Sequence, residues 1–346
     1  MSTPLRWRVA ALVVVSLVCV AAAAGYLLHV ARRGAASNQA VPTPAGAPSI
    51  AALRGEPHVL FRSMLPGAVT QGRVGAVPIA TPRGQRAITD LQCWRVHVAG
   101  GRGMCVNDDP GFLASFGVAF FGPDLKLEHQ TAVNGSPSRA RVSPDGRLGV
   151  VTMFSEGHTY AVIGSFSTET AFFDTITGKR LANLEEFKVT RNGVRFEAVD
   201  FNFWGVTFAR EHGKFYATLG TGGQTYLVEG TVQSRRVRVL RSGVECPSLS
   251  PDNTRIAFKK LVSRGDGGLG PLRWRVSVLD LETLEDEFVA DTRNVDDQVE
   301  WLDDETVLYA VDDNFGPLDT WAVPANGSGK PRLFIQAGDS PTVVRD

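Results

Sequence analysis

Four cysteines carry the most distinctive chemistry of this chain. Cys93 and Cys105 flank a Gly-Gly turn, so the two strands of one hairpin bring them face to face. In an oxidising compartment they can form a disulfide, which for so short a loop contributes about 2–3 kcal/mol. The alternative is a pair of buried free thiols. Cys19 and Cys246 stand apart, and no Cys-x-x-Cys pair indicates a zinc or thioredoxin-type site.

Three pairs of adjacent aspartates form a second candidate site. Two pairs lie in loops between the second and third strands of a blade and one lies in a link between blades, and strand direction places all three on the same face of the fold. A cation such as calcium, or a basic partner surface, would lower the repulsion among them. The alternative is an acidic rim that only keeps the protein soluble. This predicted acidic binding face consists of Asp108, Asp109, Asp296, Asp297, Asp312 and Asp313.

No other motif indicates catalysis or a resident metal. The chain contains neither a His-Glu-x-x-His run nor a Gly-x-Ser-x-Gly elbow, and its six histidines share no short metal-ligand spacing. We therefore predict no catalytic residues, no metal ligands and no cofactor apart from calcium at the acidic face. The 36 basic and 36 acidic residues give a net charge of zero, so nothing points to a nucleic-acid partner.

The N-terminal region predicts export. After a short tail of residues 1–8, residues 9–31 form an apolar run without Asp, Glu, Lys or Arg, long enough to cross a bilayer. It is either an uncleaved single-pass anchor, with the rest of the chain on the extracytoplasmic side, or a signal peptide cleaved near Ala22-Ala23-Ala24 before secretion. Residues 32–56 are expected to be a flexible spacer, because their first part is rich in Ala, Pro, Ser and Gly.

The elements that must position these residues come from an internal repeat. A short apolar strand, a turn-prone polar stretch and a second mixed strand recur six times at a spacing close to 50 residues. Further hairpins lie between the copies, and that spacing fits a four-stranded propeller blade. The copies begin at Ala76, Ala119, Ala171, Tyr226, Ser277 and Ala322.

The repeat predicts an all-β fold, a six-bladed propeller over residues 57–346. The first blade has no partner strand before residues 58–63, and residues 339–344 resemble the missing strand. We expect the C-terminal strand to pair with the first blade, because ring closure removes exposed sheet edges.

These repeats resemble the TolB-like propeller family. The resemblance rests on the turns Ser143-Pro144-Asp145-Gly146 and Ser250-Pro251-Asp252-Asn253 and on later turns such as Thr177-Gly178-Lys179, and it covers about 290 residues. With its anchor, the chain resembles the membrane-anchored actinobacterial type. The resemblance implies a periplasmic or cell-surface scaffold that binds other proteins.

Two functions follow as expectations. The first is a non-catalytic propeller that binds an envelope protein or another envelope partner through its loop face, with the long loops at residues 156–165, 186–202 and 263–272 as the recognition surface. The alternative is an extracytoplasmic lyase or hydrolase with its site at the channel mouth. A histidine within reach of a carboxylate inside the channel would favour the alternative.

Overall fold

The computed structural model describes residues 7, 10, 12–22, 24–25, 49–53, 55–67, 69–109, 116–155, 167–264, 271–311 and 317–345. Residues 12–22 are helical. In this part of the chain, no helix combines the length and the mean hydropathy that crossing a membrane requires. The anchor or signal segment therefore stays a prediction from the sequence.

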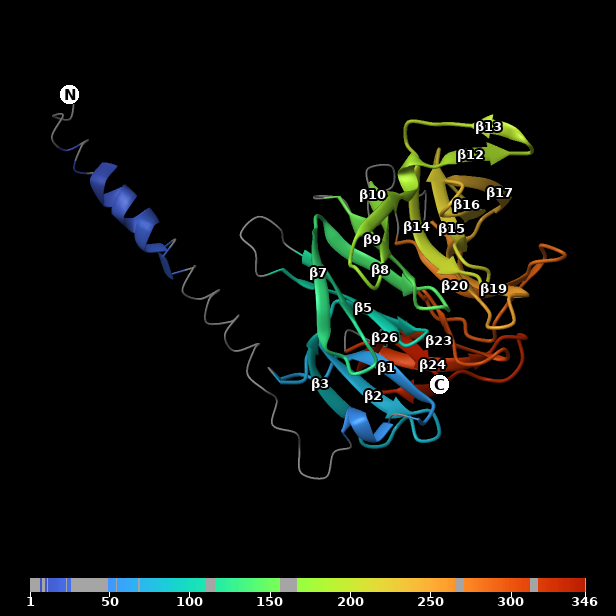
Figure 1. Cartoon of the computed structure of the whole chain (residues 1–346), viewed down its shortest axis with the longest axis horizontal. Coiled ribbons are helices and arrows are strands. Elements are labelled where there is room, and N and C mark those ends of the chain that lie inside the picture. The colour runs from blue at the N-terminus through green and yellow to red at the C-terminus, as the bar shows by residue number, and fades with distance from the viewer. Residues whose placement is uncertain are drawn as a thin grey trace. The chain divides into compact units, whose positions relative to one another are not determined.

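The described residues of the second unit, Thr43–Asp346, form six β-sheets, which are the blades of the predicted propeller (Figure 1). Blade 1 consists of β26 (Gly338–Val344), β1 (His58–Ser63), β2 (Arg73–Pro78) and β3 (Ala87–Gln92). Blade 2 consists of β4 (Arg95–Ala99), β5 (Arg102–Asp108), β6 (Phe116–Phe121) and β7 (Leu127–Val133). Blade 3 consists of β8 (Ser136–Val142), β9 (Leu148–Phe154), β10 (Thr168–Asp174) and β11 (Arg180–Asn183).

Blades 4 to 6 continue the same order from first to last strand. Blade 4 contains β14 (Asn202–Phe208), β15 (Lys214–Thr221), β16 (Gln224–Thr231) and β17 (Arg236–Ser242). Blade 5 consists of β18 (Glu245–Leu249), β19 (Arg255–Ser263), β20 (Arg273–Asp280) and β21 (Asp286–Phe288). Blade 6 consists of β22 (Glu300–Trp301), β23 (Thr306–Val311), β24 (Asp319–Pro324) and β25 (Arg332–Ile335). The six repeated copies in the sequence are the third and fourth strands of the blades, as predicted.

The ring closes as the sequence predicted. Strand β26 pairs antiparallel with β1, from His58 opposite Val344 to Ser63 opposite Gly338. The first strands of neighbouring blades contact one another around the ring, so they line a central channel. They all begin at one end of the channel, which we call the loop face, and end at the other, which we call the turn face. In blades 2 to 6, turns at the turn face lead into the second strands.

Blade 4 differs from the prediction. Residues 186–202 were expected to form a recognition loop, but β12 (Lys188–Arg191) and β13 (Val194–Phe196) make a hairpin instead. Strand β12 pairs in parallel with β17, which extends this blade to six strands. The other two predicted recognition loops lie mostly outside the described residues.

The Ser-Pro-Asp turns work by side-chain hydrogen bonds to the local backbone. Ser143 donates its Oγ–H to Asp145 Oδ1 at 2.6 Å and accepts from the Leu148 amide at 2.9 Å, while Asp145 accepts from the Arg147 amide. Gly146 adopts a φ of +74°, which a side chain would disfavour, and lies directly against the Gly100 backbone of the next turn. The turns of blades 2 and 3 therefore pack closely on the turn face.

Buried apolar side chains fill the spaces between blades in several clusters. One cluster, between blades 1 and 2, also takes in Leu53 from the short 3₁₀ helix η1 (Ile50–Leu53). The last part of the predicted spacer is thus ordered against the propeller. A second 3₁₀ turn, η2 (Leu184–Glu186), leads from blade 3 into the β12–β13 hairpin.

Candidate functional site: the two ends of the central channel

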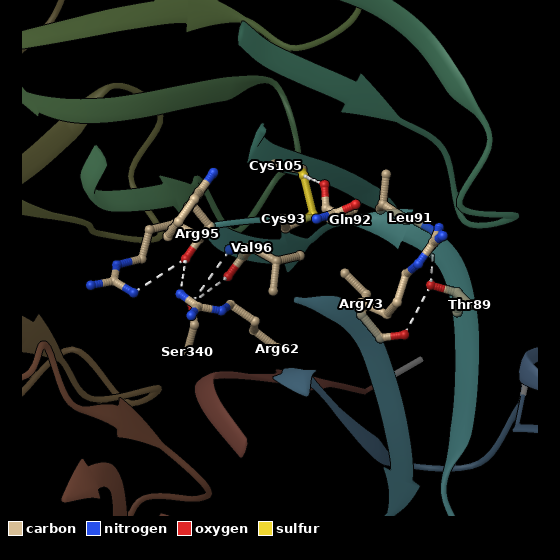
Figure 2. Close-up of a disulfide and its surroundings, with 12 residues drawn as sticks. Arg62, Arg73, Thr89, Leu91, Gln92, Cys93, Arg95, Val96, Cys105 and Ser340 are labelled. Carbon is tan, nitrogen blue, oxygen red and sulfur yellow. Dashed lines mark hydrogen bonds between the residues drawn. A yellow bond between two sulfur atoms is a disulfide. The ribbon is translucent and has the colours of Figure 1, made fainter. Parts of the chain in front are cut away.

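A disulfide fixes the start of blade 2. Cys93 and Cys105 are bonded, with their Cα atoms 5.5 Å apart and both side chains buried (Figure 2). The Cys93 amide also donates to the Gly72 carbonyl, and the Trp94 amide donates to the Val106 carbonyl. These constraints hold the two residues that follow Cys93 in place at the loop face.

Two arginines converge beside this disulfide. Arg62 of β1 and Arg95 of β4 both donate to the Trp94 carbonyl oxygen, at 3.3 and 3.2 Å (Figure 2). Each also lies 3.7 Å from a different carboxylate oxygen of Asp339 on β26. The Arg62 guanidinium lies over the ring of Trp94, which is 44% exposed. Two cations and an exposed indole are thus presented together.

The electrostatics of this pair are set mainly by burial. Burial raises the pKa of Asp339 above its usual value and outweighs the opposing effect of Arg95 and Arg62. Burial also lowers the pKa of Arg95, and the nearby positive charge of Arg139 lowers it further. Asp339 and Asp297 oppose this lowering of the Arg95 pKa, but burial and the neighbouring arginines outweigh them.

Arg139 completes the cluster from β8. Its guanidinium lies 3.9 Å from Asp296, which precedes β22 on another blade, and Asp296 also pairs with the buried ammonium group of Lys259. Burial would raise the pKa of Asp296, but the charges of Lys259 and Arg139 outweigh it and hold the pKa below its usual value. We call Arg62, Arg95 and Arg139, with Trp94, the arginine mouth.

The structure does not gather the predicted aspartates into an uncompensated acidic face. Asp296 lies among cations, and Asp297 accepts hydrogen bonds from the amides of Gln298 and Ala310. Asp108 accepts from the Trp94 indole at 2.8 Å, and Asp109 is half-buried beside it. Asp312 and Asp313 lie outside the described residues. The sequence predicted that Asp296 would attract a cation or a basic partner surface. The structure instead pairs Asp296 with Lys259 of strand β19.

A network of hydrogen-bonded side chains, which we call the plug, crosses the middle of the channel. Arg141 of β8 donates to Glu300 of β22 through Nη1, and to Ser248 Oγ at 3.2 Å and the Val299 carbonyl at 2.5 Å through Nη2. Gln298 donates from Nε2 to the carbonyls of Val206 and Pro247 at 3.1 Å each. These side chains tie the first strands of four blades together.

His97 of β4 approaches the same carboxylate. The Val142 amide donates to His97 Nδ1 at 3.1 Å, so the neutral ring carries its proton on Nε2, which lies 3.8 Å from Glu300 Oε2. Burial lowers the pKa of His97, which keeps it neutral at physiological pH. Burial would raise the pKa of Glu300, but Arg141 and His97 overcome it and lower that pKa to about 2.

A cavity of about 390 Å³ opens on the turn-face side of this plug. All six blades contribute to its lining, and Arg141, Glu300 and His97 form part of its wall. The central channel therefore has a cavity towards the turn face and a cluster of arginines at the loop face.

The residues that the structure describes contain no evident metal site. Among the described residues, no group of three or more His, Cys, Asp or Glu side chains is arranged to hold a metal ion. The calcium hypothesis consequently has no ligand set in that part of the chain.

The sequence offered one unused signal for these residues. Arg139 and Arg141 alternate with small and apolar residues along β8, and alternate residues of a strand share a face. Cations at alternate positions of a blade's first strand indicate a charged channel. Their partner Glu300 carried no comparable signal, since it lies 159 residues away and only ring closure brings it near.

Comparisons with known proteins show likeness in fold rather than in sequence. No protein-family model matches the chain, and no curated protein matches it. TolB from Acinetobacter baumannii is similar at 15% identity and a TM-score of 0.55, covering 84% of this chain and 69% of that one. A putative TolB from Agrobacterium tumefaciens gives 11% identity, a TM-score of 0.51 and coverages of 82% and 90%. A chain of a nidogen/laminin complex is 11% identical with a TM-score of 0.54, and the match covers 83% of this chain and 98% of that one.

Six blades, closure by the C-terminal strand and Ser-Pro-Asp turns agree with these likenesses. The described part of the chain from residue 58 onward therefore has the TolB-like six-bladed propeller fold.

Proposed function

We propose that this protein is a non-catalytic extracytoplasmic scaffold that binds an acidic protein surface through its loop face. The observation that carries the proposal is the arginine mouth, where Arg62, Arg95 and Arg139 converge beside the exposed ring of Trp94. Arginine and tryptophan are enriched among the residues that dominate binding energy at protein interfaces.

The charge of the mouth determines the chemistry of the partner. Asp339 lies 3.7 Å from both Arg62 and Arg95 and makes no direct hydrogen bond to either, so these two guanidinium groups are the ones we expect to engage an anion of the partner. Carboxylates suit them, because a guanidinium can donate two parallel hydrogen bonds to one carboxylate. The acidic face expected from the sequence would have required a basic partner, whereas the arginine mouth requires an acidic one.

Export supports the proposal independently. The apolar N-terminal run is expected to anchor the chain or direct its secretion, and the Cys93–Cys105 bond suits an oxidising compartment. The propeller would then face an envelope partner from the extracytoplasmic side. The likeness to two TolB structures agrees with a scaffold role at the envelope.

The test compares binding of two charged polymers by the full chain in detergent. Polyglutamate should bind the native protein with an affinity that falls steeply with salt, and polylysine should not bind. The triple variant R62Q/R95Q/R139Q should lose polyglutamate binding, whereas R210Q, at the turn face, should retain it. Polylysine binding to the native protein, or equal polyglutamate binding by both variants, would contradict the proposal.

One observation favours an enzymatic alternative. His97 and Glu300 lie 3.8 Å apart in the channel wall of a cavity, as a channel-mouth lyase or hydrolase would require. However, Glu300 is ionised and already paired with Arg141, so His97 is the group with a free role in proton transfer. Turnover of a uronide or ester substrate that is abolished in H97Q but kept in R95Q would favour this alternative over the scaffold.

A further inference from the structure

Blade 4 differs from the other blades because two additional strands widen its outer edge. Strand β12 pairs in parallel with β17, and β13 continues the sheet beyond β12. The β12–β13 hairpin lies at the periphery of the propeller (Figure 1). The outer part of this blade is therefore a small sheet of β13, β12 and β17, and no other blade has such an extension in the part of the chain that the structure describes.

One face of this small sheet gathers positive charge. Val189 and Val237 are paired across β12 and β17 and are both buried in the apolar core, so the residues on either side of them point away from that core. The same register places Thr190 of β12 between an arginine of β13 and an arginine of β17. The outward face carries four exposed cations, which we call the basic platform: Lys188, Arg195, Arg236 and Arg238.

Lys188 and Arg236 are the cations of the platform without a carboxylate partner. The register of β12 and β17 sets them directly opposite each other, and neither makes an ion pair with any residue that the structure describes. Like charges in directly opposed positions destabilise a sheet, because their repulsion is not compensated. An anion that lies over both side chains would remove that cost.

The other two cations of the platform are partly compensated. Arg238 Nε donates to Glu229 at 2.7 Å, and Lys214 of β15 shares the same carboxylate at 2.9 Å. Arg195 pairs with Glu197. With the unpaired lysine and arginine, five cations face two carboxylates on this surface. The surface therefore keeps an excess of positive charge that attracts anions.

Exposed apolar side chains lie beside the platform. Val194, at the tip of the β12–β13 hairpin, is 69% exposed, and Val199, which follows the hairpin, is fully exposed. Both are more exposed than every other large apolar side chain in the described part of the propeller. Arg195 follows Val194 directly, so charge and apolar surface occur together at the tip. This combination is typical of segments that lie in the interface of a bilayer with anionic lipids.

From these features we propose that the basic platform docks on an anionic lipid surface. Its cations meet the headgroup phosphates, and Val194 enters the interface between the headgroups. A soluble polyanion would satisfy the charges but would leave the exposed valines in water, so the pairing of charge with apolar surface favours lipid. The anchor expected from the sequence would hold the platform beside a bilayer and raise its effective concentration there. The surface goes beyond the proposed function, because it uses none of the residues of the arginine mouth.

The test asks whether the outer edge of blade 4 contacts lipid in the full chain. Cys19→Ser leaves the buried Cys246 as the free cysteine, and a fluorophore is then attached at Val199→Cys or, as the matched control, at the exposed Gln85→Cys on blade 1. The chain is reconstituted into vesicles that contain lipids with a nitroxide on the headgroup, which quenches a fluorophore close to the bilayer.

The expected result depends on lipid charge. In vesicles of equal parts phosphatidylglycerol and phosphatidylcholine, quenching at position 199 should be at least about twofold stronger than at position 85. This difference should disappear in pure phosphatidylcholine and at high salt, because both remove the electrostatic attraction. Equal quenching at the two positions in the anionic vesicles would overturn the proposal.

Two variants of equal charge change test which cations are responsible. The platform variant should show no more quenching at position 199 in anionic vesicles than the native chain shows in phosphatidylcholine, and it consists of K188Q/R195Q/R236Q/R238Q. The control variant should keep the quenching of the native chain, and it removes four exposed cations of blades 1, 2 and 6 by R83Q/K126Q/K330Q/R332Q. Circular dichroism checks that both are folded. An equal loss of quenching in the two folded variants would overturn the assignment to the platform.

Lipid docking and partner binding can fail independently. The platform variant should keep polyglutamate binding, which we assign to the arginine mouth, and R62Q/R95Q/R139Q should keep the quenching at position 199. A soluble polyanion is the competing occupant. If polyphosphate changes the fluorescence at position 199 in detergent while anionic vesicles leave it unquenched, the platform binds a soluble polyanion and the lipid proposal is wrong.

Discussion

Two buried carboxylates at different depths of one channel face arginines, yet their pKa values move in opposite directions. Glu300 in the plug receives a direct hydrogen bond from Arg141, and its pKa falls to about 2. Asp339 at the arginine mouth has two arginines at 3.7 Å, and its pKa rises. Both side chains are largely buried, at 13% and 5% exposure.

The comparison shows that contact geometry, more than the number of nearby cations, decides the charge of a buried acid. A direct charge-assisted hydrogen bond overcomes the desolvation that burial imposes, whereas a gap of 3.7 Å does not. The plug is therefore an internally satisfied ion pair with a structural role. The arginine mouth is electrostatically incomplete, which is why we assign partner binding to it.

The largest expected effect comes from breaking the satisfied pair. Arg141→Met leaves the Glu300 carboxylate buried without its main partner, and this should lower the free energy of unfolding by about 3–5 kcal/mol. Urea denaturation followed by circular dichroism measures the loss. R210M, which removes an exposed arginine at the turn face, should change stability by less than about 0.5 kcal/mol. A loss of stability below about 1 kcal/mol in R141M would show that Arg141 is not the main partner of the buried Glu300 carboxylate.

Lowering the pH should remove the stability that ionised Glu300 contributes to the native protein. The folded pKa of Glu300 is depressed to about 2 from an ordinary 4.5, so the stability it contributes is complete above pH 4.5 and is lost as pH falls towards 2. This difference corresponds to about 3 kcal/mol. Unfolding measured from pH 6 to pH 2.5 should show the decline, and E300Q should flatten it. An identical decline in E300Q would assign it to other carboxyls.

Removing the disulfide should affect one end of the channel more than the other. The variant C93A/C105A opens a loop with a sequence separation of 12 and should lose about 2–3 kcal/mol of stability. Because the bond holds Trp94 and Arg95 in place, polyglutamate binding should also weaken in the folded variant. Thermal unfolding measures the loss of stability, and calorimetry measures the binding. Unchanged polyglutamate binding by the folded variant would show that the disulfide does not position the arginine mouth.

The architecture could be predicted because each part of it is local in sequence. Every blade repeats a hairpin pattern of apolar strands and turn residues, and the unpaired strand at residues 339–344 had only the first blade to complete. The disulfide was predictable for the same reason, since Cys93 and Cys105 belong to one hairpin. The β12–β13 hairpin was missed because its strands are short and its parallel pairing with β17 spans about 47 residues.

The site was only partly predictable, because charges on different blades decide it. Asp296 looked like half of an acidic pair, but Lys259 and Arg139 reach it from two other blades. Arg141 and Glu300 likewise meet only through ring closure. A sequence shows which charges exist, whereas their partners across a ring depend on register and blade order.

The smallest expected effect tests the electrostatically incomplete end. Because the folded pKa of Asp339 lies above its ordinary 3.8, the native state favours the protonated form, and this group costs stability as pH rises through that range. Asp339→Asn removes this cost. The free energy of unfolding of D339N should equal that of the native protein near pH 3 and should exceed it by up to about 1 kcal/mol at pH 7. E300Q should show the opposite trend, since it loses a group that stabilises the fold when ionised. Urea denaturation of both variants at pH 3 and pH 7 measures the crossing. If D339N instead lost stability on going to pH 7, Asp339 would be a satisfied partner of Arg62 and Arg95, and the arginine mouth would have no spare capacity for an acidic partner.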